Sequence, residues 1–323
     1  MSLMDKFSST QYSPYINSIN PNSLCIEINN TQGKGSVYVH DVFNGILTLF
    51  VDISSKEWPI AGVGGYENIY FLNYCIKGRC EVTLENGMTT CISDGEVSIS
   101  KSSAIKKFLY PLKQYEGIEF VFAMSEIEQS CEILKGFFGI DLVKMLEHYT
   151  SGKLLFTTEM SLKLKLLMKK LWENRSDESS FEMKMNILGI LHAFSSLEIV
   201  ADNKKRFYLT GVQTQIAKAI EAKITKDLEV KITVSELSRQ FDISETTLKT
   251  YFKNLYGKNI SAYLQEVRMN EAARLIEKTT YTIADISGMV GYENQSKFAA
   301  VFKTYFNCSP LEYRRLKYFE DKV

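Results

Sequence analysis

Short apolar runs with a period of two dominate the chain from about residue 36 to residue 125. Residues 46–51 and 70–76 are rich in β-branched and aromatic side chains, and turn signals such as Lys77-Gly78 bound these runs. Residues 80–92 are typical of a β-hairpin, because two strand-like runs flank the pair Asn86-Gly87. Many short strands at this spacing predict a small barrel or sandwich.

After residue 125 the apolar period changes from two to about 3.6, which is the period of a helix. Three amphipathic helices are predicted between residues 127 and 194, with a polar loop at residues 174–180. Residues 201–206 carry no apolar anchor and are interpreted as an interdomain linker, and from about residue 207 the chain is helical to residue 323. The apolar positions of these helices are Ile127, Cys131, Leu134, Phe138 and Leu142, then Met160, Leu164, Leu167, Met168 and Leu171, then Met183, Ile187, Ile190, Leu191 and Phe194, and finally Val212, Ile216, Ile220 and Ile224.

These patterns predict a multidomain protein in three parts. The length of 323 residues fits two or three domains, since one domain usually takes about 100–200 residues. We expect a β-rich, barrel-like sensing domain at residues 1–125 and a helical dimerisation or coupling segment at residues 126–203. Residues 204–323 are expected to form an all-α domain.

The charge of the whole chain is balanced but unevenly distributed. Lysine plus arginine and aspartate plus glutamate both number 38, which excludes a generally basic protein that coats nucleic acid. Residues 204–323 contain 20 basic and 14 acidic residues, so a net charge of +6 there is offset by −6 in the rest of the chain.

Nothing in the sequence indicates a membrane or an oxidising compartment. No stretch approaches the roughly 18–20 uninterrupted apolar residues of a membrane span, and the N-terminal residues lack the apolar core of a secretory signal. We therefore expect a cytoplasmic protein whose scattered cysteines stay reduced. The cysteines are Cys25, Cys75, Cys80, Cys91, Cys131 and Cys308.

The C-terminal third contains an internal repeat. Each copy predicts a short helix, a turn and a second helix, at about residues 233–254 and 282–306, with one extra residue in the second turn. This is the order of a helix-turn-helix, in which the second helix enters the major groove of DNA. At an offset of 49 residues Leu237, Ser238, Phe241 and Ile243 recur as Ile286, Ser287, Val290 and Tyr292, and at an offset of 50 residues Leu248, Phe252, Lys253, Gly257 and Tyr263 recur as Phe298, Phe302, Lys303, Asn307 and Tyr313.

The second copy contains the runs Ile283-Ala284-Asp285-Ile286, Val290-Gly291-Tyr292, Asn294-Gln295-Ser296, Val301-Phe302-Lys303, Ser309-Pro310 and Tyr313-Arg314. These runs resemble the signature of the AraC/XylS family of bacterial transcription regulators almost position by position. The first copy is similar, and the resemblance covers about residues 207–318. It implies a DNA-binding domain with two helix-turn-helix units that read successive major grooves, behind an N-terminal barrel of the cupin-like type.

The sequence departs from the family pattern at three positions. Asn307 replaces the usual glycine after the second recognition helix, although asparagine tolerates the left-handed conformation expected there. Thr250 and Ala300 stand where many relatives carry long polar side chains, which weakens the expectation of bidentate base contacts at these two positions.

Helical periodicity separates the core of each recognition helix from the side chains that reach DNA. Leu248 and Phe252 are expected to point inward on the first helix, and Phe298 and Phe302 on the second. Threonine and glutamine suit base edges or thymine methyl groups, and lysine suits phosphates or guanine. The predicted DNA-binding residues are Thr246, Thr247, Lys249, Thr250, Lys253, Asn294, Gln295, Ser296, Lys297, Ala300, Lys303 and Arg314.

The N-terminal domain offers fewer candidates. Tyr66, Tyr70 and Tyr74 are candidate ligand-binding residues, but alternating aromatic residues on a strand are more often simply core. A metal-binding cupin needs clustered histidines and carboxylates, and the chain has only His40, His148 and His192. We therefore expect no metal and no other cofactor.

Three hypotheses for function follow. The first is a transcription regulator, expected to be an activator and a homodimer, which binds promoter DNA, a small effector and RNA polymerase. The second is a regulator controlled by a protein partner instead of a small ligand. The third is an enzyme or DNA-repair protein that carries the same DNA-binding module, which would need a zinc-bound cysteine cluster.

Overall fold

The computed structural model describes residues 13–20, 22–31, 33–58, 68–176, 181–196 and 206–320. The chain divides into two compact units, residues 1–210 and residues 211–323. No helix in these ranges is both long and apolar enough to cross a membrane.

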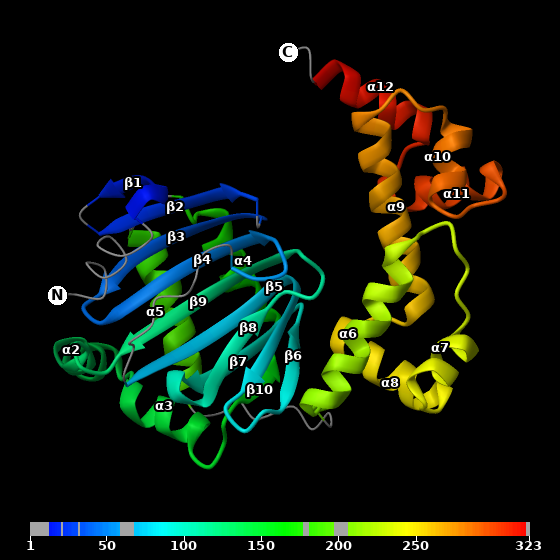
Figure 1. The fold of residues 1–323 in the computed structure, drawn as a ribbon. Coiled ribbons are helices and arrows are strands. Elements are labelled where there is room, and N and C mark those ends of the chain that lie inside the picture. The colour runs from blue at the N-terminus through cyan, green and yellow to red at the C-terminus, as the bar shows by residue number, and fades with distance from the viewer. Residues whose placement is uncertain are drawn as a thin grey trace. The chain divides into compact units, whose positions relative to one another are not determined.

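The first unit is built on a strongly bent antiparallel β-sheet (Figure 1). The strands follow the order β1-β2-β3-β4-β9-β5-β7-β10, while β6 and β8 pair with the far half of β5. The fold class predicted for the N-terminal part is therefore confirmed, although its strands begin before residue 36. The strands are β1 (Ile16–Asn20), β2 (Ser23–Asn30), β3 (Gly33–Phe43), β4 (Ile46–Ser54), β5 (Ile69–Leu84), β6 (Thr89–Ser93), β7 (Glu96–Lys101), β8 (Ile105–Leu109), β9 (Tyr115–Ala123) and β10 (Phe156–Glu159), with short 3₁₀ turns at Ser13–Tyr15 and Ser102–Ala104.

Strand β5 turns the sheet back on itself. Its first half pairs with β7 and β9, and its second half with β6 and β8. Gly78 lies at the bend with φ of +92°, and a Cβ there would lie 2.1 Å from the carbonyl oxygen of Gln114. The hairpin predicted around Asn86-Gly87 is confirmed, since Thr83 of β5 pairs with Thr89 of β6.

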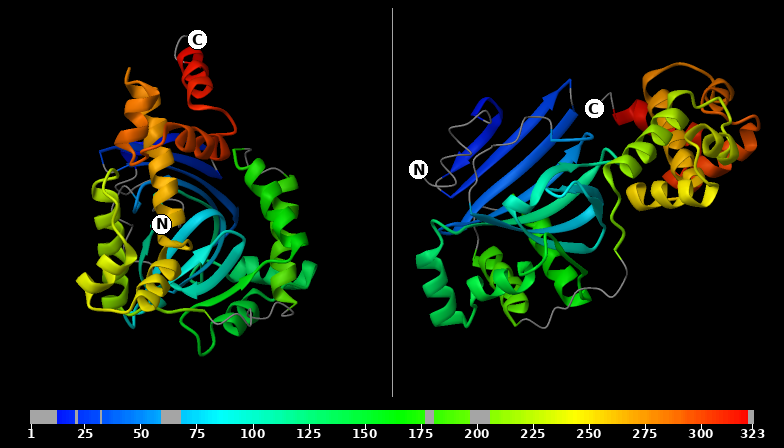
Figure 2. Two further views of the ribbon diagram at one scale, coloured as in Figure 1. Left: turned by 90° about the vertical axis from the view of Figure 1, so that its right-hand side faces the viewer. Right: turned by 60° about the horizontal axis from the view of Figure 1, so that its bottom comes forward.

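Four helices cover the outer face of the sheet: α2 (Glu128–Phe138), α3 (Leu142–Thr150), α4 (Leu162–Glu173) and α5 (Phe181–Ser195) (Figure 2). Their apolar sides share one core with outward residues of the sheet, including Phe50, Tyr70 and Phe120. Residues 126–196 therefore complete the β-domain within one unit. The inner face of the bent sheet holds a second core, built from residues such as Leu49, Val82 and Tyr115.

The single helix predicted across residues 127–142 is wrong, because it is two helices. Gly139 ends α2 in the left-handed region at φ of +67°, and Asp141 then caps α3 by accepting a hydrogen bond from the Lys144 amide at 3.1 Å. Strand β10, which pairs with β7, interrupts the predicted helical region as well.

The predicted linker is only partly observed, since residues 201–205 lie outside the described ranges. Arg206 forms an ion pair of 2.7 Å with Glu96, and Leu209 exchanges two backbone hydrogen bonds with Thr89. Residues 206–209 therefore belong to the first unit. The first helix of the second unit starts at Gly211, not near residue 207, because residues 206–210 run along the sheet instead.

The second unit contains seven helices in the described range: α6 (Gly211–Lys226), α7 (Val234–Phe241), α8 (Glu245–Tyr256), α9 (Ile260–Lys278), α10 (Ile283–Met289), α11 (Gln295–Phe306) and α12 (Pro310–Glu320). Helix α9 runs between the two repeats, and its buried residues contribute to the core around α10 and α11. The buried side of α6 is formed by Ala217, Ile220 and Ile224, whereas Val212, the first apolar position of the predicted pattern, is exposed.

Candidate nucleic-acid interface

The first repeat folds as a helix-turn-helix whose ends are fixed by side chains. Thr233 and Glu236 form a capping box that starts α7, and these hydrogen bonds lower the pKa of the Glu236 carboxyl. Asp242 ends α7 in the left-handed region at φ of +50°. Ser244 then caps α8 by accepting a hydrogen bond from the Thr247 amide at 3.1 Å.

The second repeat reproduces this arrangement. Thr282 and Asp285 form the capping box of α10, and the same hydrogen bonds lower the pKa of Asp285. Asn294 caps α11 by accepting a hydrogen bond from the Lys297 amide at 2.9 Å. Asn307 ends α11 at φ of +58°, so the left-handed conformation expected at this non-glycine position is confirmed.

The aromatic packing behind the recognition helix has nearly the same geometry in both repeats. The rings of Phe252 and Tyr263 have centroids 5.4 Å apart at an interplanar angle of 82°, and those of Phe302 and Tyr313 have centroids 5.5 Å apart at 80°. Each tyrosine hydroxyl donates a hydrogen bond to a carboxylate, Tyr263 to Glu221 and Tyr313 to Glu277. The internal repeat of the sequence is therefore a structural repeat with equivalent cores.

The outward side of α8 carries the predicted DNA-binding residues of the first unit. Leu248 and Phe252 are fully buried, and Thr246, Lys249, Thr250 and Lys253 are exposed on the other side. Lys249 forms an exposed ion pair of 3.1 Å with Glu245, four residues earlier on α8. This pair is weak in water, because exposed ion pairs contribute only about 0–1 kcal/mol, so Lys249 can exchange its partner for a phosphate.

Two threonine hydroxyls of this helix are engaged with the protein itself. The Thr250 hydroxyl donates a hydrogen bond of 2.8 Å to the carbonyl of Thr246. The Thr247 hydroxyl shares a hydrogen bond of 2.8 Å with the Ser244 hydroxyl. Thr250 therefore presents its methyl group to the outside more readily than its hydroxyl.

The outward side of α11 is the equivalent surface of the second unit. Phe298 and Phe302 are fully buried, as predicted. The exposed predicted residues on this helix and its cap are Asn294, Gln295, Ser296, Lys297, Ala300 and Lys303. The Asn294 side chain is committed to the cap, so Gln295, Ser296 and Lys297 are the polar side chains in the first turn with freedom to reach a base or phosphate.

Arginines near the helix ends have structural partners. Arg314 is partly buried, and its guanidinium donates a hydrogen bond of 2.7 Å to the carbonyl of Tyr281, which precedes α10. Arg268 of α9 donates to the carbonyl of Leu228 at 2.7 Å and stacks near the Tyr292 ring. The Arg314 side chain is thus hydrogen-bonded to the segment before α10, whereas the lysines of α8 and α11 are exposed.

The two capping boxes were not predicted from the sequence. In both, a threonine is followed three positions later by an acidic residue and then by an apolar residue. This spacing is visible in the sequence as Thr233-x-x-Glu236 and Thr282-x-x-Asp285, and it would have predicted both boxes.

Comparison with known proteins identifies this architecture. Residues 237–316 match a protein-family model described as a helix-turn-helix domain. The chain is 22% identical over 246 residues to the HTH-type transcriptional activator CsvR of Escherichia coli, covering 76% of this chain and 90% of CsvR. These sequence matches confirm the predicted resemblance to the AraC/XylS family of transcriptional regulators. The protein is a DNA-binding transcriptional regulator.

Other transcriptional regulators match this chain over different extents. The DNA-binding dual transcriptional regulator Rns of Escherichia coli is 22% identical, covering 76% of this chain and 89% of Rns. The HTH-type activator RhaR of Mannheimia succiniciproducens is 29% identical over 28% of this chain and 33% of RhaR.

Solved structures give the same two kinds of match. An apo form of ToxT from Vibrio cholerae is 16% identical, with a TM-score of 0.33 over 84% of this chain and 97% of that chain. The C-terminal domain of the response regulator yesN from Fusobacterium nucleatum is 31% identical, with a TM-score of 0.29 over 32% of this chain and 99% of that one. The resemblance to the AraC/XylS family rests on the sequence matches, since both TM-scores are low.

Two of the three candidate ligand-binding tyrosines, Tyr70 and Tyr74, lie within the described residues of the first unit. Tyr70 and Tyr74 lie on the outer face of β5, buried in the core beneath the helices, and burial raises the pKa of Tyr74. Tyr66 lies outside the described residues. This burial matches the interpretation as core that the sequence left open.

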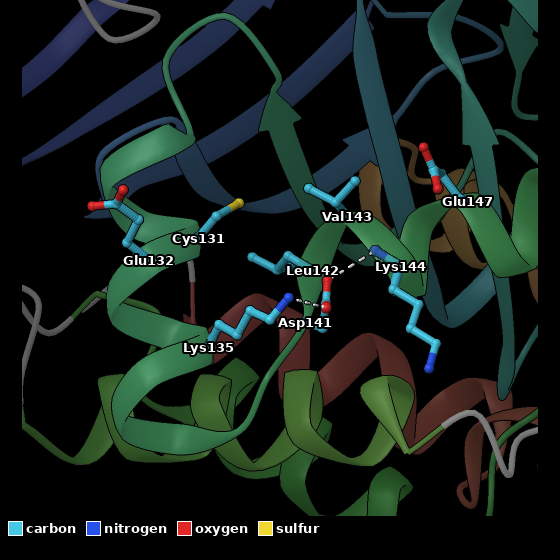
Figure 3. Close-up of a pocket in the computed structure, with 8 residues that line it drawn as sticks. All are labelled: Cys131, Glu132, Lys135, Asp141, Leu142, Val143, Lys144 and Glu147. Carbon is cyan, nitrogen blue, oxygen red and sulfur yellow. Dashed lines mark hydrogen bonds and ion pairs between the residues drawn. The ribbon is translucent and has the colours of Figure 1, made fainter.

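A surface pocket of about 420 Å³ lies between α2 and α3 (Figure 3). Two of its charged side chains are paired with each other, because Lys135 forms an ion pair of 2.8 Å with Asp141. This pair raises the pKa of Lys135 and lowers that of Asp141. The Lys135 and Asp141 side chains are therefore already engaged with each other in this pocket.

Metal-binding groups are not gathered anywhere in the described ranges: no three histidine, cysteine, aspartate or glutamate side chains are placed to hold an ion. Four of the six cysteines are buried, and all six are free thiols. Burial raises the pKa of Cys91 to about 11, so its thiol stays protonated and unreactive near neutral pH.

Proposed function

We propose that this regulator is a sequence-specific activator whose two helix-turn-helix units read successive major grooves of promoter DNA. The observation that carries the proposal is the structural repeat of α7–α8 and α10–α11, with equivalent aromatic cores and equivalent exposed helix faces. Recognition helices of this kind dock into the major groove, and two units one helical turn apart would span about 34 Å. The relatives CsvR and RhaR are named activators, which supports the direction of regulation.

Base reading is assigned to Thr246, Thr250, Gln295, Lys297 and Ala300. Their side chains are exposed on the outward sides of α8 and α11. Phosphate contacts are assigned to Thr247, Lys249, Lys253, Ser296 and Lys303. Asn294 and Arg314 are assigned mainly to holding the DNA-contacting segments in place, with additional DNA contacts at the edges of these segments. Contacts to phosphates set affinity and contacts to base edges set specificity.

The first unit is proposed to sense a signal and to supply the dimer surface. Helix α4 exposes Leu162 and Leu166, four residues apart, and α5 exposes Phe181 and Met185 at the same spacing. Large contiguous apolar patches on a protein surface mark sites of protein–protein interaction. We assign these side chains to the contact between two copies of the chain, with RNA polymerase and a small effector as the further partners.

The test is selection of bound DNA from a random duplex library by the full-length protein, followed by sequencing. The proposal predicts an enriched motif with two conserved segments in each recognised site. Tight, salt-sensitive binding without any enriched motif would mean that the second unit binds only the phosphate backbone of DNA. That result would contradict sequence-specific regulation.

A further inference from the structure

Three segments that lie far apart in the sequence meet in the second unit at the side chain of Arg268. This arginine lies on α9, the helix that joins the two repeats (Figure 1). Its guanidinium donates a hydrogen bond of 2.7 Å to the carbonyl of Leu228, in the segment that leads into α7. The same guanidinium lies over the ring of Tyr292, in the turn between α10 and α11, with its Cζ atom 5.9 Å from the ring centroid. One side chain therefore contacts the segment that begins the first helix-turn-helix and the turn of the second.

The backbone of Gly291 completes this contact. Its φ is +77°, and a Cβ at this position would lie 2.2 Å from the Leu228 carbonyl oxygen and 2.6 Å from a guanidinium nitrogen of Arg268. The turn of the second helix-turn-helix thus packs directly against the segment before α7, and only a glycine fits between them. Beside this contact, Lys231 of the same segment forms an exposed ion pair of 2.6 Å with Glu293, which lowers the pKa of Glu293.

The Arg268 contact is better protected from water than this exposed ion pair. Arg268 is half-buried, and burial lowers the pKa of its guanidinium, which nevertheless stays charged near neutral pH. A charged donor on a carbonyl and a cation over an aromatic ring both strengthen when water is excluded. The pair of Lys231 and Glu293 is exposed on both sides and contributes little by comparison.

This contact belongs to the junction between the repeats and is not part of either repeat. The aromatic cores recur at an offset of 50 residues, but the residue fifty positions after Arg268 is Tyr318. The turn of the first helix-turn-helix contains Asp242-Ile243 in place of Gly291-Tyr292. A side chain required inside each helix-turn-helix would be expected in both copies, so Arg268 acts on the relation between the copies.

We propose that Arg268 is a positioning residue, which fixes the register between the two recognition helices on DNA. This inference rests on the proposed reading of successive major grooves and names the contact that holds the two units in place. Helix α9 joins the units at one point and Arg268 ties them at a second, so neither unit can rotate about the helix axis. A module that is already rigid loses little freedom when both helices dock, which favours a correctly spaced operator over a misspaced one.

The test measures spacing selectivity with the full-length protein by fluorescence anisotropy. Spacing selectivity is the affinity for the library-selected operator divided by the affinity for a version with one base pair inserted between its two segments. It should be at least about tenfold in the wild type and about threefold or less in Arg268→Met, which keeps an apolar stem but removes the charge and the hydrogen bond. Affinity for an operator with one segment randomised should stay within about twofold of the wild type, since each unit remains folded.

Arg274→Met is the matched control on the same helix. Arg274 is exposed, and its guanidinium donates hydrogen bonds of 2.8 and 2.7 Å to Glu271 within α9, so this variant should keep the wild-type spacing selectivity.

A second pair of variants tests the same junction at exposed positions, where folding is not at risk. Lys231→Glu places a like charge beside Glu293 and should lower the spacing selectivity by about twofold. The double variant Lys231→Glu/Glu293→Lys restores the opposite charges and should restore the selectivity. Any uniform effect of these charges on DNA affinity cancels in the ratio.

Amide hydrogen exchange of the DNA-free protein gives a readout that does not depend on DNA. Arg268→Met should speed exchange in residues 228–233 and 291–294 and leave α8 and α11 unchanged. Wild-type selectivity or wild-type exchange in Arg268→Met, or loss of its binding to single segments, would overturn the positioning role alone. A wild-type protein without spacing selectivity would instead overturn the tandem reading on which that role rests.

Discussion

The Thr250 hydroxyl donates a hydrogen bond of 2.8 Å to the Thr246 carbonyl, one helical turn earlier on the exposed side of α8. This bond occupies the polar end of the side chain and leaves the methyl group facing outward. The residue at the equivalent position of α11, fifty residues later, is Ala300, which is also exposed and carries only a methyl group. Both recognition helices therefore present a methyl group at the same point.

Thr250 is predicted to read a thymine methyl group. In the selected operator, replacing the contacted thymine by deoxyuridine should weaken wild-type binding several-fold, because the contact between two methyl groups is lost. Thr250→Val keeps the methyl and should bind within about twofold of the wild type. Thr250→Ser removes it and should no longer distinguish thymine from deoxyuridine in a fluorescence anisotropy titration. If Thr250→Ser retains that discrimination, the contact is made by another residue.

Substitutions of Gln295 and Lys253 are predicted to impair DNA binding in different ways. Gln295→Ala should relax the preference at a single base pair, costing about 1–3 kcal/mol on the preferred base and little on the others. Lys253→Ala should weaken binding to all sequences. It should also reduce the slope of log affinity against log salt concentration by about one. Both variants are compared across a set of single-base operator changes at several salt concentrations. Uniform loss on all sequences from Gln295→Ala would refute its role in base reading.

Asn307 is predicted to tolerate glycine but not alanine. Its φ of +58° is favourable for glycine and acceptable for asparagine, but it strains other side chains. Asn307→Ala should lower the free energy of unfolding of the second unit by about 1 kcal/mol, whereas Asn307→Gly should leave it unchanged or raise it. Gly257→Ala, at φ of +75° in the equivalent position of the first repeat, is the matched comparison and should be destabilising. Urea unfolding followed by circular dichroism measures all three.

Glu119 is predicted to make the stability of the first unit fall as the pH rises. In the unfolded chain the carboxyl ionises near its ordinary pKa of 4.5, whereas in the folded protein it stays protonated up to about pH 7. The folded state therefore binds more protons between these values, and the free energy of unfolding decreases across this window. Glu119→Gln should be more stable than the wild type by roughly 2–4 kcal/mol at pH 8, with a much smaller difference at pH 4.5. The same difference at both pH values would show that titration of Glu119 is not the cause.

Leu166 is predicted to lie in the contact between two copies. Leu166→Asp should convert a dimer to a monomer in sedimentation equilibrium, because it places a charge at an apolar contact. Glu132→Lys changes an exposed residue of a different helix, α2, and should leave the dimer intact. A wild-type chain that is monomeric at all concentrations, or a dimer that survives Leu166→Asp, would contradict this surface.

The second unit was the part most open to prediction from sequence. Its signals are local: Ser244 precedes the helix that it caps, and Leu248 and Phe252 are one helical turn apart on the buried side. Because the same pattern occurs in both copies of the repeat, chance does not readily explain it in either one. The departures were also local, such as Asn294, whose predicted contact competes with its capping hydrogen bond.

The first unit was harder to predict, because its structure depends on pairing between distant strands. The apolar spacing from Ile127 to Leu142 is continuous through Gly139, and only the left-handed conformation of that glycine divides it into two helices. The pairing of Asn73 with Ser98 on one side and with Glu119 on the other has no signature in the sequence, since these residues come together only through strand register.

The spacing of the two DNA segments tests tandem groove reading most directly. The affinity of the full-length protein is measured for the library-selected operator and for versions in which one to ten base pairs are inserted between the two conserved segments. Helix α9 joins the two repeats within one compact unit, so every insertion should weaken binding at least about tenfold, and the uninserted segments should lie about 10 base pairs apart. Unchanged affinity across the insertions, or a single conserved segment that accounts for all of the affinity, would contradict reading by both units.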